Sequence, residues 1–148
     1  MQTKKEFFEF ENKTQKIFDD FYIKKGYQVK RIQGTANKDY DCEVQIDGKW
    51  YKIEEKFRSL DYNDCLVELV QDTETNSPGW IDYCKADYIL YGVGDKIYCI
   101  DLPQLKDFVA KHKDKFNKKI SKKGWGRTEN LVIPWYIIKA NNLGKRIK

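Results

Sequence analysis

The residues of this sequence that are best suited to chemistry lie on either side of a short turn, Asp47-Gly48. Both residue types tolerate the positive φ of a two-residue type I′ turn, so the pair predicts a hairpin in which Ile46 lies opposite Lys49. With that register, Asp41 lies across from Glu54. Cross-strand partners share one face of a sheet, so the hairpin is predicted to bring two carboxylates within about 5 Å of each other.

The other face of the predicted hairpin is apolar, which agrees with this register. Its side chains are Cys42, Val44, Ile46, Tyr51 and Ile53. A slip of one residue would bury the charges instead of these side chains, so we expect the apolar face to pack against a helix. The same register places Asp39 across from Lys56, which makes Asp39 a competing first acid.

Two facing carboxylates repel each other unless a cation relieves them. Lys56 is one candidate cation, and a divalent metal ion is the other. Asp41, Glu54 and the backbone carbonyl of Glu55 offer only oxygen ligands, which suits Mg²⁺ or Mn²⁺. Glu54 and Lys56 share a face because strand side chains alternate, and Arg58 continues that face. The set suits phosphodiester hydrolysis, with Lys56 assisting the attack of water and Arg58 holding a neighbouring phosphate.

An acid on one strand followed by an acid-x-lysine triplet on the next resembles the PD-(D/E)XK, or restriction-endonuclease-like, nuclease superfamily. Asp41 matches the first acid, Glu54 the second and Lys56 the lysine, while Tyr40 stands where the motif has proline. The resemblance implies an α/β fold whose central mixed sheet of about four to six strands is flanked by helices. It also implies a metal-dependent endonuclease that cleaves DNA in recombination, repair, restriction or mobile-element biology, with a homodimer as one arrangement.

Two alternatives to this function stay open. Glu-x-Lys triplets are common in a chain with 34% charged residues, and most are solvated ion pairs. If the Glu54–Lys56 triplet is such an ion pair, the first alternative holds: the chain is a catalytically inactive member of the same fold that binds nucleic acid or inhibits a partner protein. An RNA-processing nuclease using the same acids is the second alternative.

Further polar residues are candidates for the same site. A helix is predicted from about residue 4 to Lys25, ended by Gly26, and it carries Glu11 beside its apolar stripe. Residues 61–72 fit either a short helix or an edge strand. In either form Glu68 completes the metal site or faces solvent, and Gln71 touches the substrate if the segment is helical.

The whole chain has a formal net charge of +5, and its lysines cluster between Lys106 and Lys123, with a further basic group at 145–148. Such clusters suit a polyanion, and a solubilising surface is the alternative. The predicted nucleic-acid contacts here are Lys118, Lys119, Lys122, Lys123, Trp125 and Arg127. The loop from Gln33 to Lys38 is a further candidate for substrate recognition.

The length of 148 residues predicts a single domain with a basic tail over about 141–148. Alternating apolar patterns predict a strand over 27–32 and a hairpin over 88–100, and a helix begins at Pro103. Pro134 makes residues 131–138 an edge strand or a strand that ends in a turn. Four widely spaced cysteines are expected to be reduced thiols, and the sequence contains no signal peptide or membrane span, so we expect a cytoplasmic protein.

Overall fold

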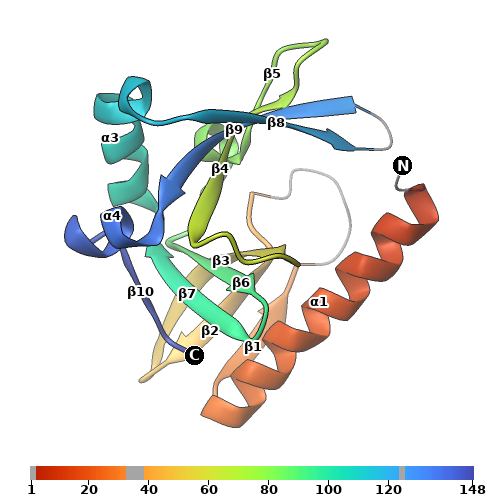
Figure 1. Cartoon of the computed structure of the whole chain (residues 1–148). Coiled ribbons are helices and arrows are strands. Elements are labelled where there is room, and N and C mark those ends of the chain that lie inside the picture. The colour runs from red at the N-terminus through yellow and green to blue at the C-terminus, as the bar shows by residue number, and fades with distance from the viewer. Residues whose placement is uncertain (1–2, 33–38, 124–125) are drawn as a thin grey trace.

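Two β-sheets and four α-helices make up the described part of the chain in the computed structural model (Figure 1). The structure describes residues 3–32, 39–123 and 126–148, apart from the side chains of Lys4, Phe7, Phe8, Glu11 and Lys123. The α/β class and the mixed central sheet are therefore as predicted. A second sheet was not predicted.

The first sheet has six strands in the order β1-β2-β3-β6-β7-β10. Its strands are β1 (Gln28–Arg31), β2 (Cys42–Ile46), β3 (Lys49–Arg58), β6 (Tyr88–Val93), β7 (Lys96–Asp101) and β10 (Gly144–Arg146). Strands β1, β2 and β3 form an antiparallel meander, whereas β3 and β6 are parallel. The parallel pair requires the chain to cross over between Arg58 and Tyr88, and the second sheet begins in this crossover.

The β2–β3 hairpin has the predicted register. Ile46 pairs with Lys49 and Cys42 with Ile53, and the turn residues Asp47 and Gly48 both have positive φ. This turn matches the right-handed twist of the strands, which is why a local sequence signal fixes the pairing.

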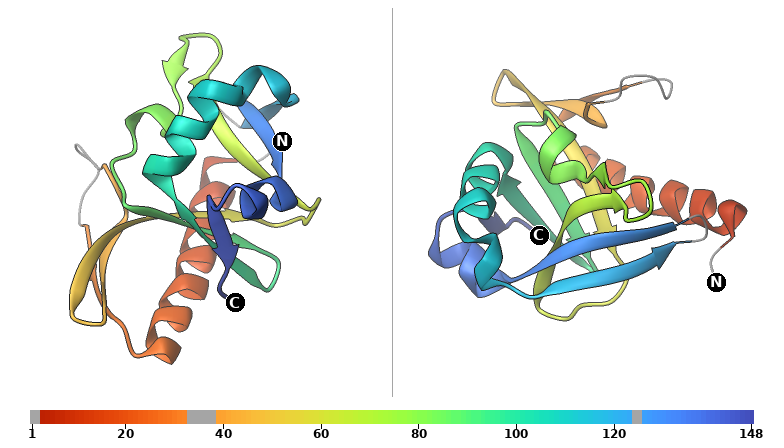
Figure 2. Two further views of the ribbon diagram at one scale, coloured as in Figure 1. Left: turned by 90° about the vertical axis from the view of Figure 1, so that its left-hand side faces the viewer. Right: turned by 90° about the horizontal axis from the view of Figure 1, so that it is seen from above.

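Helix α1 (Lys4–Lys25) covers one face of the first sheet (Figure 2). A reciprocal capping box between Thr3 and Glu6 starts the helix, and Gly26 in the left-handed conformation ends it, as predicted. Phe18, Phe21 and Tyr22 of α1 pack on the apolar face of the hairpin and on its neighbouring strands.

The second sheet covers the opposite face and is antiparallel, in the order β5-β4-β9-β8. Its strands are β4 (Asp64–Asp72), β5 (Ser77–Pro78), β8 (Lys118–Lys123) and β9 (Gly126–Pro134). The segment 61–72 therefore contains a strand, over Asp64–Asp72, rather than a helix, but this strand lies between β5 and β9 and is not the predicted edge strand. The helices α2 (Trp80–Tyr83), α3 (Leu102–His112) and α4 (Trp135–Ala140) share a core with this sheet and with β6 and β7.

The prediction of an edge strand over residues 131–138 is wrong. Strand β9 is central in its sheet rather than an edge, because it pairs with β4 on one side and β8 on the other. Pro134 ends the strand, and the chain continues as helix α4. The expected tail contains strand β10, which pairs with β7.

Helix α3 begins beside Pro103 as predicted, and it is followed by a 3-10 turn over Lys113–Lys115. All four cysteines are free thiols, as expected. In the described residues, no helix is long and apolar enough to cross a membrane.

Candidate active site

Glu54 and Lys56 lie side by side on the face of β3 that is turned toward the second sheet. Lys56 Nζ lies 3.6 Å from Glu54 Oε2. The Glu54 side chain is only 9% exposed, whereas that of Lys56 is 31% exposed. The Lys56 ammonium also lies 6.0 Å from the centre of the buried Trp80 ring. The predicted acid-x-lysine pair is therefore brought together, with Glu54 buried and Lys56 partly exposed.

The charge of Lys56 is set by two opposing effects. Burial alone would lower the pKa of this lysine, but Glu54, Tyr83, Asp41 and Glu68 together raise it above its usual value. Lys56 is consequently a cation at neutral pH. Burial and the two glutamates raise the pKa of Tyr83 despite the nearby ammonium, so Tyr83 keeps its proton.

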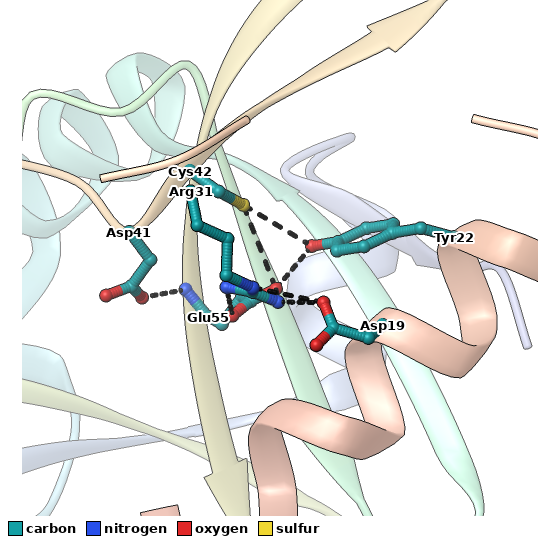
Figure 3. Close-up of polar contacts among 6 residues, drawn as sticks. All are labelled: Asp19, Tyr22, Arg31, Asp41, Cys42 and Glu55. Atoms are coloured by element: carbon teal, nitrogen blue, oxygen red, sulfur yellow. Dashed lines mark hydrogen bonds and ion pairs between the residues drawn. The ribbon is translucent and has the colours of Figure 1, made fainter. Parts of the chain in front are cut away.

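Asp41 departs from the predicted arrangement at the end of the ladder. Its N–H donates to the Ile53 carbonyl at 3.0 Å, although Cys42 is the residue that pairs with Ile53. Two successive residues thus oppose one residue of β3, which is the pattern of a β-bulge. The Asp41 carboxylate is turned along β3 and accepts a hydrogen bond of 2.7 Å from the Glu55 N–H (Figure 3).

The same irregularity explains why the predicted Asp39–Lys56 pairing is wrong. The β2–β3 ladder ends at Cys42, and the Asp39 carboxylate lies 3.6 Å from Lys85 Nζ instead. The Asp39 side chain is 44% exposed, so this pair is a surface contact. Asp41 is therefore the better first acid.

Glu55 points to the opposite face of β3 from Glu54 and Lys56. Arg31 donates two hydrogen bonds to its carboxylate, at 2.9 and 3.1 Å, and the Tyr22 hydroxyl donates a third at 2.6 Å (Figure 3). Arg31 also binds Asp19 of α1. Burial raises the pKa of Glu55 above its usual value, although the hydrogen bonds from Arg31 and Tyr22 oppose that shift.

The sequence reasoning missed this network of the buried Tyr22, the partly buried Arg31 and Glu55, and the more exposed Asp19, and it assigned only the Glu55 carbonyl a role. A signal was available. Ile53 and Phe57 lie on the apolar face, so strand alternation forces Glu55 onto the same face, where a carboxylate needs a cation.

A small polar pocket of about 160 Å³ opens between α1 and the β2–β3 strands. Asp41, Glu55, Lys56 and Arg31 line it together with Thr14 and neighbouring residues. Its volume exceeds the roughly 10–15 Å³ that one water molecule needs, so the pocket can hold a group the size of a hydrated ion or phosphate.

Arg58 does not have the predicted free guanidinium. It forms an ion pair with Asp64 at the start of β4, and it lies 4.7 Å from the centre of the exposed Tyr62 ring. Its side chain is only 13% exposed, so it holds the β3–β4 connection in place.

The remaining candidates have mixed outcomes. Glu68 is buried on β4 and acts electrostatically on Lys56, which places this acid near the site. Gln71 was predicted to touch the substrate if its segment were helical. The segment is strand β4, and Gln71 is exposed there. The Glu11 side chain and the loop from Gln33 to Lys38 lie outside the described residues.

The predicted nucleic-acid contacts lie on the β8–β9 hairpin, at the edge of the second sheet. Lys122 pairs in register with Arg127, and both are exposed. Lys118 lies 3.7 Å from Glu129, and Lys119 lies 5.5 Å from the centre of the Tyr62 ring. The Lys123 side chain and Trp125 lie outside the described residues. In the described part of this hairpin, Lys118, Lys119, Lys122 and Arg127 are all exposed.

In the described part of the chain, no three His, Cys, Asp or Glu side chains come together as a complete metal site. The donors that do meet near Lys56 are carboxylates, so any ion bound there would be a hard cation that keeps much of its hydration. No protein-family model matches this chain, and the comparisons with curated proteins and with solved structures return no match.

Proposed function

We propose that this chain is a Mg²⁺- or Mn²⁺-dependent nuclease that hydrolyses phosphodiester bonds in DNA. The observation that carries the proposal is the grouping on β3. Glu54 and Lys56 lie 3.6 Å apart on one face, and the Asp41 carboxylate is bound to the backbone of the residue between them. This is the residue set that the resemblance to the PD-(D/E)XK superfamily requires.

The topology supports the same conclusion. Helix α1 is followed by the three-stranded meander β1–β2–β3, a crossover and the parallel strand β6. Asp41 directly precedes β2 and Glu54 lies in the middle of β3, so both acids belong to this meander. A sheet of this kind, flanked by helices, is what the resemblance implies.

The donor set fits a divalent cation. The carboxylates of Asp41 and Glu54 would hold the ion, because Mg²⁺ is commonly bound through one or two carboxylates, with water and substrate phosphate completing its shell. When bound, the ion would supply a water molecule of lowered pKa and positive charge for the phosphate.

The residues of the chain have distinct parts in the proposed reaction. Lys56, kept protonated by the surrounding acids, would hold a phosphate oxygen and stabilise the charge that develops on it. The β8–β9 hairpin, with Lys122 and Arg127 exposed, would contact the backbone of the nucleic acid.

The test compares cleavage by the wild type with that of Asp41→Asn, Glu54→Gln and Lys56→Met. Supercoiled, linear, single-stranded and branched DNA, and RNA, are incubated with Mg²⁺, Mn²⁺ or EDTA. Each variant is expected to lose at least about a hundredfold in rate, because each removes charge that acts in the transition state. Calorimetry with Mn²⁺ should show binding that Asp41→Asn and Glu54→Gln weaken.

Glu43→Gln and Lys52→Met are matched controls, because Glu43 pairs with Lys52 across the same two strands, two residues nearer the turn than Asp41 and Glu54. They should keep activity within about threefold of the wild type. Full cleavage by Glu54→Gln would refute the assignment. Absence of Mn²⁺ binding and cleavage in the wild type would favour an inactive binding protein, and cleavage of RNA alone would favour RNA processing.

A further inference from the structure

We propose that Glu55 is a positioning residue which, held by Arg31 and Tyr22, fixes the Asp41 carboxylate and the Glu54–Lys56 pair in their working geometry. The inference rests on the proposed function and deepens it. It assigns Arg31 and Tyr22 to the site, although both bind the side chain of Glu55, which points to the opposite face of β3 from Glu54 and Lys56 (Figure 3 shows the Glu55 contacts).

Both the backbone N–H and the side-chain carboxylate of Glu55 form hydrogen bonds. Its N–H donates to Asp41 Oδ2 at 2.7 Å, so the orientation of that carboxylate depends on where the Glu55 backbone lies. Its own carboxylate accepts from Arg31 through both oxygens and from Tyr22 through Oε2. Two-point pairing of a guanidinium with a carboxylate fixes direction as well as distance, so Glu55 has little freedom to rotate or shift.

The contacts of Glu55 join three parts of the fold at one point. Arg31 belongs to β1, Tyr22 to α1 and Glu55 to β3. Arg31 also binds Asp19 one turn before Tyr22, so the guanidinium connects the helix with the strand. The middle of β3 is therefore held against α1 and β1 at the residue that separates Glu54 from Lys56.

Stability alone does not account for an ion pair at this position. The Glu55 carboxylate is only 7% exposed and Arg31 is 19% exposed, and a buried ion pair is often no more stabilising than apolar residues of similar size. The neighbours of Glu55 on this face, Ile53 and Phe57, are apolar. A metal-binding carboxylate such as Asp41 requires a fixed orientation, and the groups that are hydrogen-bonded to it provide that orientation.

Two nearly isosteric variants test the inference. Tyr22→Phe removes one hydroxyl from the network, and Glu55→Gln removes its charge while keeping the backbone N–H. Tyr91→Phe is the matched control, because Tyr91 is equally buried and its hydroxyl accepts a hydrogen bond from the Leu66 N–H. All are compared well below their unfolding temperatures.

Tyr22→Phe and Glu55→Gln are expected to weaken Mn²⁺ binding and to lower kcat by about 10- to 100-fold, with KM for DNA little changed. The Glu55 amide should also exchange with solvent about tenfold faster or more. Tyr91→Phe should lose stability without these changes. The inference is overturned if Mn²⁺ affinity, kcat and Glu55 amide exchange in both network variants match those of Tyr91→Phe.

The two proposals can fail separately. A wild-type protein that neither binds Mn²⁺ nor cleaves nucleic acid would refute the nuclease. Amide exchange would still test the positioning role, because it requires no metal and no substrate. The Glu55 amide is expected to exchange slowly in the wild type and faster in Tyr22→Phe. Unchanged exchange in Tyr22→Phe and Glu55→Gln would refute that role by itself.

Discussion

Replacing Arg31 with methionine should reveal how strongly the fold depends on the buried charge of Glu55. Methionine keeps much of the length and apolar contact of the arginine side chain but removes its guanidinium. Among the described side chains, Glu55 would then keep the Tyr22 hydroxyl at 2.6 Å and the weaker Cys42 thiol at 3.8 Å as donors. Its carboxylate, 7% exposed, would be a charge without a cation in the apolar layer beneath α1.

The expected cost follows from this burial. Removing one partner of a buried ion pair typically costs about 3–5 kcal/mol, because the other charge is left without compensation. For a chain of this size, that loss corresponds to roughly 10 °C in Tm. Adding Glu55→Gln to Arg31→Met also removes the uncompensated carboxylate charge. The free energy of unfolding of the double variant should therefore exceed that of Arg31→Met by about 2 kcal/mol.

The pH dependence has a definite sign. Burial already raises the pKa of Glu55 above its usual value, against the effect of Arg31. A carboxyl with a raised pKa in the folded state binds protons more tightly when folded, so its contribution to stability falls as pH rises from about 4.5 through the raised value. Without Arg31 the pKa rises further. The loss in Arg31→Met should therefore be larger at pH 7 than at pH 4.5.

Urea unfolding of the wild type, both single variants and the double variant at these two pH values measures the coupling. Lys16→Met and Asp20→Asn form the control cycle, because this ion pair of α1 is 77% and 62% exposed and should couple by less than about 0.5 kcal/mol. Additive losses for Arg31 and Glu55, or a loss independent of pH, would contradict the reasoning.

Two other predictions concern the second sheet. Gly79→Ala should lower the free energy of unfolding by about 3 kcal/mol in urea titrations, because a Cβ there would lie 2.2 Å from the Glu68 carbonyl oxygen; wild-type stability would contradict the close packing of Gly79 on β4. If the β8–β9 hairpin contacts DNA, Lys122→Ala with Arg127→Ala should reduce the slope of log K against log salt by about 2. Lys13→Ala with Lys16→Ala on α1 should leave that slope unchanged.

The sequence by itself determined the local parts of the site. Positive φ at Asp47 and Gly48 fixed the hairpin register, and strand alternation placed Glu54 beside Lys56. The capping signals of α1 likewise fixed where that helix begins and ends. These features depend on residues close together in the chain, so a pattern of a few residues contains the physical information that decides them.

Only the tertiary structure decided the rest. Residues 64–72 became a strand because β9, about sixty residues later in the chain, pairs with them, and that pairing brought Glu68 toward Lys56. Arg58 forms an ion pair with Asp64. The irregular end of the β2–β3 ladder places the Asp41 carboxylate where it accepts a hydrogen bond from the Glu55 N–H. Contacts between distant segments depend on which surfaces pack together and on the loops between them, and no local period in the sequence specifies either.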